Sequence, residues 1–137
     1  MTRMEGTGEY ARIDGEAISL VVACDDAGGA DLIYCGPTLE ADADLAALAK
    51  SQRYSRHENQ PDIPPRAGLL PERKYGYAGH SAVALRLGAG RVHTDFRVTA
   101  LAAKGRRLTI TYENAEPAVR VTLTWEIASG DVLASHV

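Results

Sequence analysis

The chain has 137 residues, which suffices for one domain and is short for two. Its formal net charge of −3 comes without a basic stripe interleaved with aromatics, so we expect no nucleic-acid partner. No segment approaches the roughly 20 apolar residues that cross a bilayer, and the N-terminus lacks a signal-peptide core. We therefore expect a cytoplasmic protein without a membrane partner, in which residues 1–8 are a disordered or tag-like tail and residues 9–137 form one domain.

The first third of the chain is a series of short apolar segments separated by turn residues. Three segments are predicted as strands: Tyr10–Ile13, Ala17–Cys24 and Leu32–Cys35. Asp14-Gly15 is a tight-hairpin signal between the first two. Asp25 and Asp26 begin the next turn, where aspartate is favoured for local backbone bonding.

The two cysteines flank that second turn. In a simple hairpin centred near Gly28, Cys24 faces Leu32 rather than Cys35, so a disulfide is not favoured. We expect two inert, partly buried thiols. No histidine stands at ligand spacing from either cysteine, so the sequence predicts no metal site.

One helix is predicted, over about Asp42–Gln52. Leu45, Leu48 and Ala49 recur at helical spacing, and alanine is plentiful. The helix is short and weakly amphipathic, so we expect it to cover a sheet edge rather than build a core.

The segment Arg53–Pro71 is predicted as a long loop. Its prolines remove backbone donors and restrict their neighbours. Loops of this length usually contact a ligand or partner, and this one carries Tyr54, His57 and Glu58. The simpler interpretation is a solvated crossover.

Strands resume after Ser81. The clearest is Val119–Ile127, in which apolar residues alternate strictly with Arg120, Thr122, Thr124 and Glu126. Such alternation indicates a strand with one face in a core and one in water. The other strands are predicted around Val83–Leu87, Val92–Thr99, Leu108–Tyr112 and Val132–Val137. The pattern predicts an all-β fold with one short helix, an antiparallel β-sandwich. Because the last strand runs to the end of the chain, we expect the 137 residues to be part of a longer protein.

Few residues suggest chemistry. Asp95 lies in a predicted strand between Thr94 and Phe96, and alternation places it on the same face as Arg97. A structural ion pair with Arg97 is the simplest expectation for it. His80 follows the glycine-bearing stretch Tyr75–Gly79, which permits close approach of a ligand or a neighbouring backbone.

Several segments, taken in order, resemble the N-terminal domain of glycoside hydrolase family 36, the α-galactosidase and raffinose-synthase-like enzymes. The clearest segment is Arg91–Arg97, which resembles the family's Thr-Asp-Phe-Arg strand through Asp95, Phe96 and Arg97. Four further segments resemble the family in order and spacing: Leu32–Pro37, Leu70–Leu85, Lys104-Gly105 and Asp131–Ala134.

The resemblance implies a β-supersandwich that precedes a catalytic (β/α)₈ barrel. That barrel is absent here, so the resemblance implies a non-catalytic fragment without metal or cofactor. Its partners would be its own barrel, further copies of the chain and a galactoside, with Tyr75 and His80 as the candidate sugar contacts. Ala78–Ser81 replaces the family's Gly-Asp-Phe-Arg, and Cys35 replaces a tryptophan.

Two other functions stay open. A free-standing carbohydrate-binding module would use exposed aromatics, here Tyr54, Tyr75 and Tyr77. A mutarotase-like epimerase would need a histidine acid and a carboxylate base. The candidates for that pair are His80 or His93 with Glu72 or Glu113.

Overall fold

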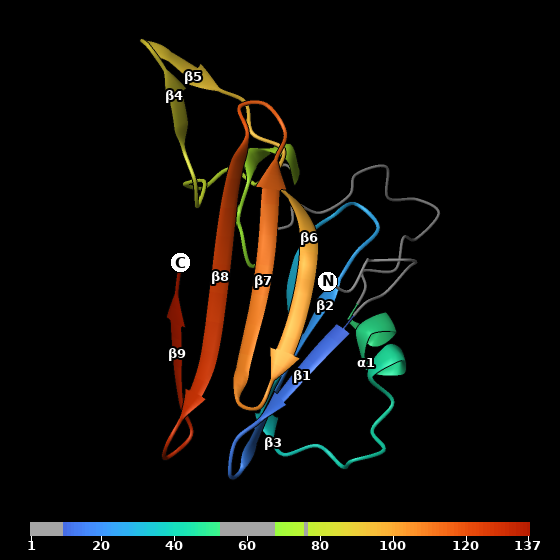
Figure 1. The fold of residues 1–137 in the computed structure, drawn as a ribbon. Coiled ribbons are helices and arrows are strands. Elements are labelled where there is room, and N and C mark those ends of the chain that lie inside the picture. Colours follow the sequence, from blue (N-terminus) through green and yellow to red (C-terminus); the bar gives the residue numbers. More distant parts are fainter. Residues whose placement is uncertain (1–9, 53–67, 76) are drawn as a thin grey trace, which may run out of the picture.

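A computed structural model describes residues 10–52, 68–75 and 77–137, and it shows an antiparallel β-sandwich with one short α-helix (Figure 1). The expected fold class is confirmed. The elements in chain order are β1 Tyr10–Asp14, β2 Ile18–Cys24, β3 Ala30–Pro37, α1 Leu45–Ser51, η1 Arg73–Tyr75, β4 Leu85–Leu87, β5 Gly90–Val92, β6 Arg97–Lys104, β7 Arg107–Asn114, β8 Val119–Ala128 and β9 Val132–His136. Among the described residues, no helix is long and apolar enough to cross a membrane.

The strands form two packed sheets and one separate ribbon. One sheet has the order β1-β2-β3 and the other β6-β7-β8-β9, with sequence neighbours paired antiparallel throughout. The short ribbon β4-β5 stands at one end of the sandwich, beside η1 (Figure 1). Consecutive hairpins explain this order, because each turn brings the next strand back beside its predecessor.

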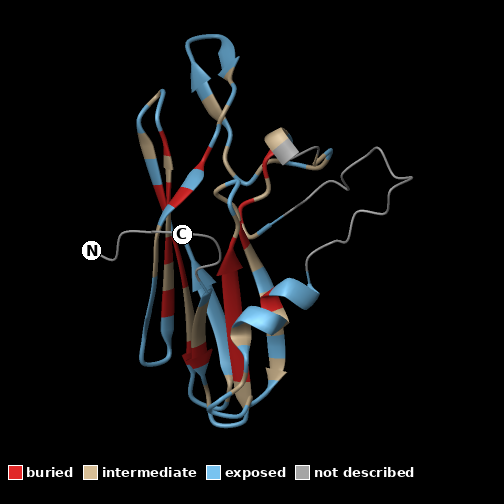
Figure 2. Ribbon diagram, turned by 90° about the vertical axis from the view of Figure 1, so that its right-hand side faces the viewer, coloured by how far each residue is buried: buried red, intermediate tan, exposed pale blue. Residues whose placement is uncertain are grey.

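The core lies between the two sheets, where alternating side chains of each strand face inward. On β7, Leu108, Ile110 and Tyr112 are at most 2% exposed, whereas the intervening threonines are only half-buried. Buried residues concentrate on the strands of the two sheets, and the ribbon is largely exposed (Figure 2). The remaining core side chains come from the strands of both sheets and from Leu70 and Phe96, which lie outside the strands. Those in strands are Ile13, Leu20, Val22, Cys24, Ala30, Val98, Val121, Leu123 and Ile127.

The helix α1 is shorter than expected and packs against β1, an edge strand, as the sequence predicted. Asp44 is its N-cap, and its carboxylate accepts a hydrogen bond from the Ala47 N–H at 2.9 Å. The chain leading to the helix is tied to β1 through Arg12. Its guanidinium donates to the carbonyls of Leu39 (2.6 Å) and Glu40 (2.7 Å).

The cysteine register differs from the expected one. Cys24 lies opposite Ala30, not Leu32, because the turn closes one residue earlier, with the Asp25 N–H donating to the Gly29 carbonyl. Cys35 lies opposite Leu20. The absence of a disulfide is confirmed, but Cys24 is buried and Cys35 is exposed, so the pair is not uniformly half-buried.

The expected single strand Val92–Thr99 is wrong. β5 ends at Val92 and β6 begins at Arg97, so residues 93–96 belong to no strand. The physical reason lies in the side chains that take up the backbone donors of this segment, described below. Residues 1–8 and most of the Arg53–Pro71 loop lie outside the described residues.

Candidate functional site

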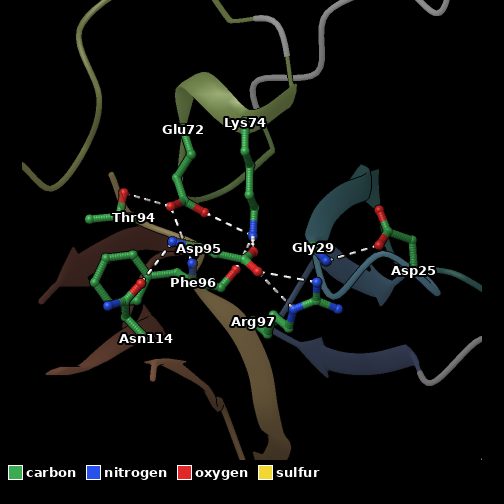
Figure 3. A network of polar contacts seen from close by, with 9 residues as sticks. All are labelled: Asp25, Gly29, Glu72, Lys74, Thr94, Asp95, Phe96, Arg97 and Asn114. Atoms are coloured by element: carbon green, nitrogen blue, oxygen red, sulfur yellow. Dashed lines mark hydrogen bonds and ion pairs between the residues drawn. The ribbon is translucent and has the colours of Figure 1, made fainter. Parts of the chain in front are cut away.

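The segment 70–75 closes one end of the sandwich and brings an acidic side chain into the interior. Leu70 enters the core, and Glu72, two residues later, is 2% exposed. The Glu72 Oε1 accepts hydrogen bonds from the Thr94 hydroxyl (3.0 Å) and the Phe96 N–H (3.2 Å) (Figure 3). The Phe96 N–H that would otherwise pair in a sheet is thus bonded to a carboxylate, which explains part of the gap between β5 and β6.

Lys74 joins two carboxylates. Its Nζ lies 3.2 Å from Glu72 Oε2 and 2.6 Å from Asp95 Oδ1 (Figure 3). The same ammonium also donates to the Phe96 carbonyl. Because Lys74 is itself only 12% exposed, it supplies the counter-charge that a buried glutamate requires.

Asp95 has partners on three sides. Its carboxylate pairs with Arg97 at 3.1 Å, so the expected Asp95–Arg97 ion pair is present, although Asp95 itself is not in a strand. Its N–H donates to Asn114 Oδ1 at 2.7 Å. The hydrogen bond from Lys74 lowers the pKa of Asp95. Partial burial opposes this effect, and the Arg97 bond adds to it, so the pKa lies below its ordinary value.

Phe96 lies between the core and a polar cluster, which consists of Glu72, Lys74, Thr94, Asp95, Arg97 and Asn114. Its side chain is 1% exposed and packs inside the sandwich, whereas Asp95 and Arg97 on either side remain at the surface. The sequence pattern did not indicate Lys74 or Asn114 as partners of Asp95, because they lie 21 and 19 residues away from it along the chain. The cluster therefore holds the segment 70–75 and the start of β6 together.

A groove of about 340 Å³ lies between η1 and the β4-β5 ribbon. The groove borders the polar cluster, because Lys74 and Thr94 belong to the cluster and also line the groove. The described residues that line the groove are Arg73, Lys74, His80, Ser81, Val83, Ala84, Leu85, Arg91, Val92, His93 and Thr94. No aspartate or glutamate is among these described lining residues.

The structure brings some of the predicted residues together and leaves others apart. His80 and His93 line the same groove, and His80 is exposed there. Tyr75 is the last residue of η1, and its side chain lies outside the described part of the structure. Tyr54, His57 and Glu58 also lie outside the described residues. Arg73 and Arg91 were not singled out from the sequence, although alternation in Arg91-Val92-His93 could have placed Arg91 and His93 on one side.

The epimerase pair does not assemble in the described residues. Glu113 lies on the outer face of its sheet, where its Oε1 is 2.7 Å from Arg120 Nη2. Glu72 is buried, with both carboxylate oxygens already bonded by Thr94, Phe96 and Lys74. The groove therefore offers imidazole, guanidinium and hydroxyl groups, which suit binding through hydrogen bonds and charge.

Comparison of the chain with family models, with characterised proteins and with solved structures finds no match.

Proposed function

We propose that this chain is a non-catalytic β-sandwich domain of an α-galactosidase-type glycoside hydrolase, and that its groove helps to shape a galactoside pocket. One observation carries the non-catalytic part. The two carboxylates beside the groove, Glu72 and Asp95, share the single ammonium of Lys74. A retaining hydrolase needs one carboxylate free as nucleophile and another as acid/base, about 5–5.5 Å apart across the sugar.

The groove supports the sugar-contact part of the proposal. His80, Arg91 and Thr94, which carry imidazole, guanidinium and hydroxyl groups, line one groove. Such groups pair with sugar hydroxyls by hydrogen bonds. The catalytic carboxylates would come from a barrel domain, which is the partner that this proposal requires.

The proposal includes association of copies through β9. The two packed sheets have three other edges, and each carries a feature that discourages pairing with another chain: α1 packs against β1, β3 contains Pro37, and β6 carries Arg97 and Lys104. β9 is the remaining edge of its sheet, and its sequence Val-Leu-Ala-Ser-His has no lysine, arginine, aspartate or glutamate. An uncharged edge strand pairs readily with its own copy in antiparallel orientation.

A second candidate function is a free-standing carbohydrate-binding module. The observation that favours it is that the described lining residues of the groove all come from one short stretch of the chain, from Arg73 to Thr94. A module would bind sugar without a barrel, whereas a scaffold domain would contribute only part of a pocket.

Three measurements on the purified chain test these functions and the epimerase alternative. With a chromogenic α-galactoside we expect no turnover, and turnover that Asp95→Asn abolishes would overturn the non-catalytic proposal. In a galactose titration followed by NMR, saturable shifts at His80 and His93 would favour the module. Absence of saturation supports the scaffold domain. Polarimetry of galactose mutarotation tests the epimerase, for which we expect no acceleration.

A further inference from the structure

The groove carries an excess of positive charge. The two carboxylates Glu72 and Asp95 are balanced by Lys74 and Arg97, which leaves Arg73 and Arg91 as the other cations among the described lining residues. Within the described residues, neither of these two arginines has a carboxylate partner. Arginine remains protonated at any physiological pH, so the groove holds two fixed positive charges beside two histidines.

The ribbon that forms one wall repeats this imbalance. In the three-pair ladder of β4 and β5, Arg86 lies directly opposite Arg91. Like charges at directly opposed positions destabilise a two-stranded ribbon. The described part of the chain supplies no acidic side chain to relieve this repulsion. A bound anion would do so.

We propose that the groove binds the oxyanion of a small ligand, a carboxylate or a phosphate, through Arg91 and Arg73. The guanidinium fork matches both groups geometrically and can donate two parallel hydrogen bonds. His80 and His93 flank the site as further hydrogen-bonding groups. The volume of about 340 Å³ is near the lower end of small-molecule sites, which agrees with a ligand the size of one sugar acid or sugar phosphate.

This inference goes beyond the proposed function, because it concerns the charge of the ligand and not the enzyme to which the domain belongs. It depends on the charges of Arg73 and Arg91, whereas the non-catalytic part of the proposed function depends on the two carboxylates that Lys74 bridges. The two can therefore fail separately.

The test is an NMR titration of the purified chain with three probes: galacturonate, galactose and inorganic phosphate. Galacturonate and galactose share a ring and differ at C6, where one has a carboxylate and the other a hydroxymethyl group. We expect saturable shifts at His80 and His93 with galacturonate, and at least about tenfold weaker binding of galactose, a ratio that corresponds to about 1.4 kcal/mol. Phosphate that displaces galacturonate from the same histidines shows that any oxyanion suffices. Phosphate that does not displace it shows that the site takes a carboxylate.

Two charge-matched variants locate the site. Arg91→Gln should weaken galacturonate binding about tenfold. Lys104→Gln also removes one positive charge, but at the end of β6 that lies away from the groove (Figure 1). We expect it to change galacturonate affinity less than about twofold, because exposed charges that far apart are screened. Equal weakening by both variants, or equal binding of galactose and galacturonate, overturns the proposal. Absence of shifts with both anions overturns it as well.

Discussion

Asp131 fills the space beside Gly15, so that a Cβ atom built at Gly15 would stand 2.0 Å from Asp131 Oδ1. The same carboxylate accepts hydrogen bonds from the N–H groups of Glu16 and Ala17, both at 2.7 Å. Asp131 follows β8, whereas Gly15 lies between β1 and β2, so this contact joins the turn of one sheet to the turn of the other. Asp131 adopts a left-handed backbone conformation, with φ of 58°, which aspartate and asparagine tolerate better than most residues.

Asp131→Ala should therefore destabilise the fold by about 1–2 kcal/mol, because two backbone donors lose their acceptor. Asp131→Asn keeps one acceptor oxygen and the backbone preference, so we expect a smaller loss. Gly15→Ala should cost about 1–3 kcal/mol, since the new methyl group displaces the carboxylate. Urea unfolding measures all three. The double variant Gly15→Ala/Asp131→Ala should lose less free energy of unfolding than the sum of its two single variants. Additive losses would show that Gly15 and Asp131 act independently.

Lys74→Met tests the bridge between Glu72 and Asp95. It leaves Glu72, which is 2% exposed, without its counter-charge, and we expect a loss of about 2–4 kcal/mol in the free energy of unfolding. The matched control is Arg73→Met, a neighbouring cation in η1 that is exposed, for which we expect less than about 0.5 kcal/mol. Glu72→Gln added to Lys74→Met should recover part of the loss. If Arg73→Met costs as much as Lys74→Met, the bridge is not what stabilises this end of the sandwich.

This bridge shows where local sequence patterns stop being informative. Alternation predicted β7 and β8 within a residue or two, because each strand presents one face to a core and the other to water. The same rule failed at residues 93–96. There the N–H of Asp95 donates to Asn114 and that of Phe96 to Glu72, which lie 19 and 24 residues away in the sequence. Partners so distant leave no trace in a local pattern.

The groove was only partly predictable for a similar reason. His80 was singled out because glycines precede it, a local signal. Its grouping with Arg73, Arg91 and His93 depends on how the β4-β5 ribbon sits against η1. That placement follows from Lys74 and Glu72 anchoring η1 to the start of β6, which is a tertiary contact.

Asp95 gives the fold an acid-sensitive component. Its pKa is held below its ordinary value of 3.8, first by the hydrogen bond from Lys74 and then by that from Arg97. A carboxyl group with a lowered folded-state pKa stabilises the fold above its unfolded value, and this contribution disappears as pH falls through the folded value. The stability difference between wild type and Asp95→Asn should therefore be full near pH 6 and shrink below about pH 3.8.

Urea unfolding at a series of pH values measures this difference. In the Lys74→Met background the pH-dependent part should become smaller, because the main cause of the lowered pKa is gone. A difference between wild type and Asp95→Asn that stays constant from pH 6 to pH 3 would contradict this origin of the acid sensitivity.

The β9 edge gives the last prediction. Val132 is 60% exposed and Leu133 is 38% exposed. Because β9 is the last strand of its sheet, it offers these apolar side chains together with the backbone N–H and C=O groups on its outer side. Leu133→Lys places a charge where a second copy would pair, and charged edge residues prevent such pairing. Sedimentation velocity should show a dimer of the wild-type chain at high concentration and a monomer of Leu133→Lys. Ala103→Lys, at an exposed position on the opposite edge strand β6, is the control and should leave the dimer intact. A monomeric wild type, or a dimer lost equally in both variants, would show that copies do not associate through β9.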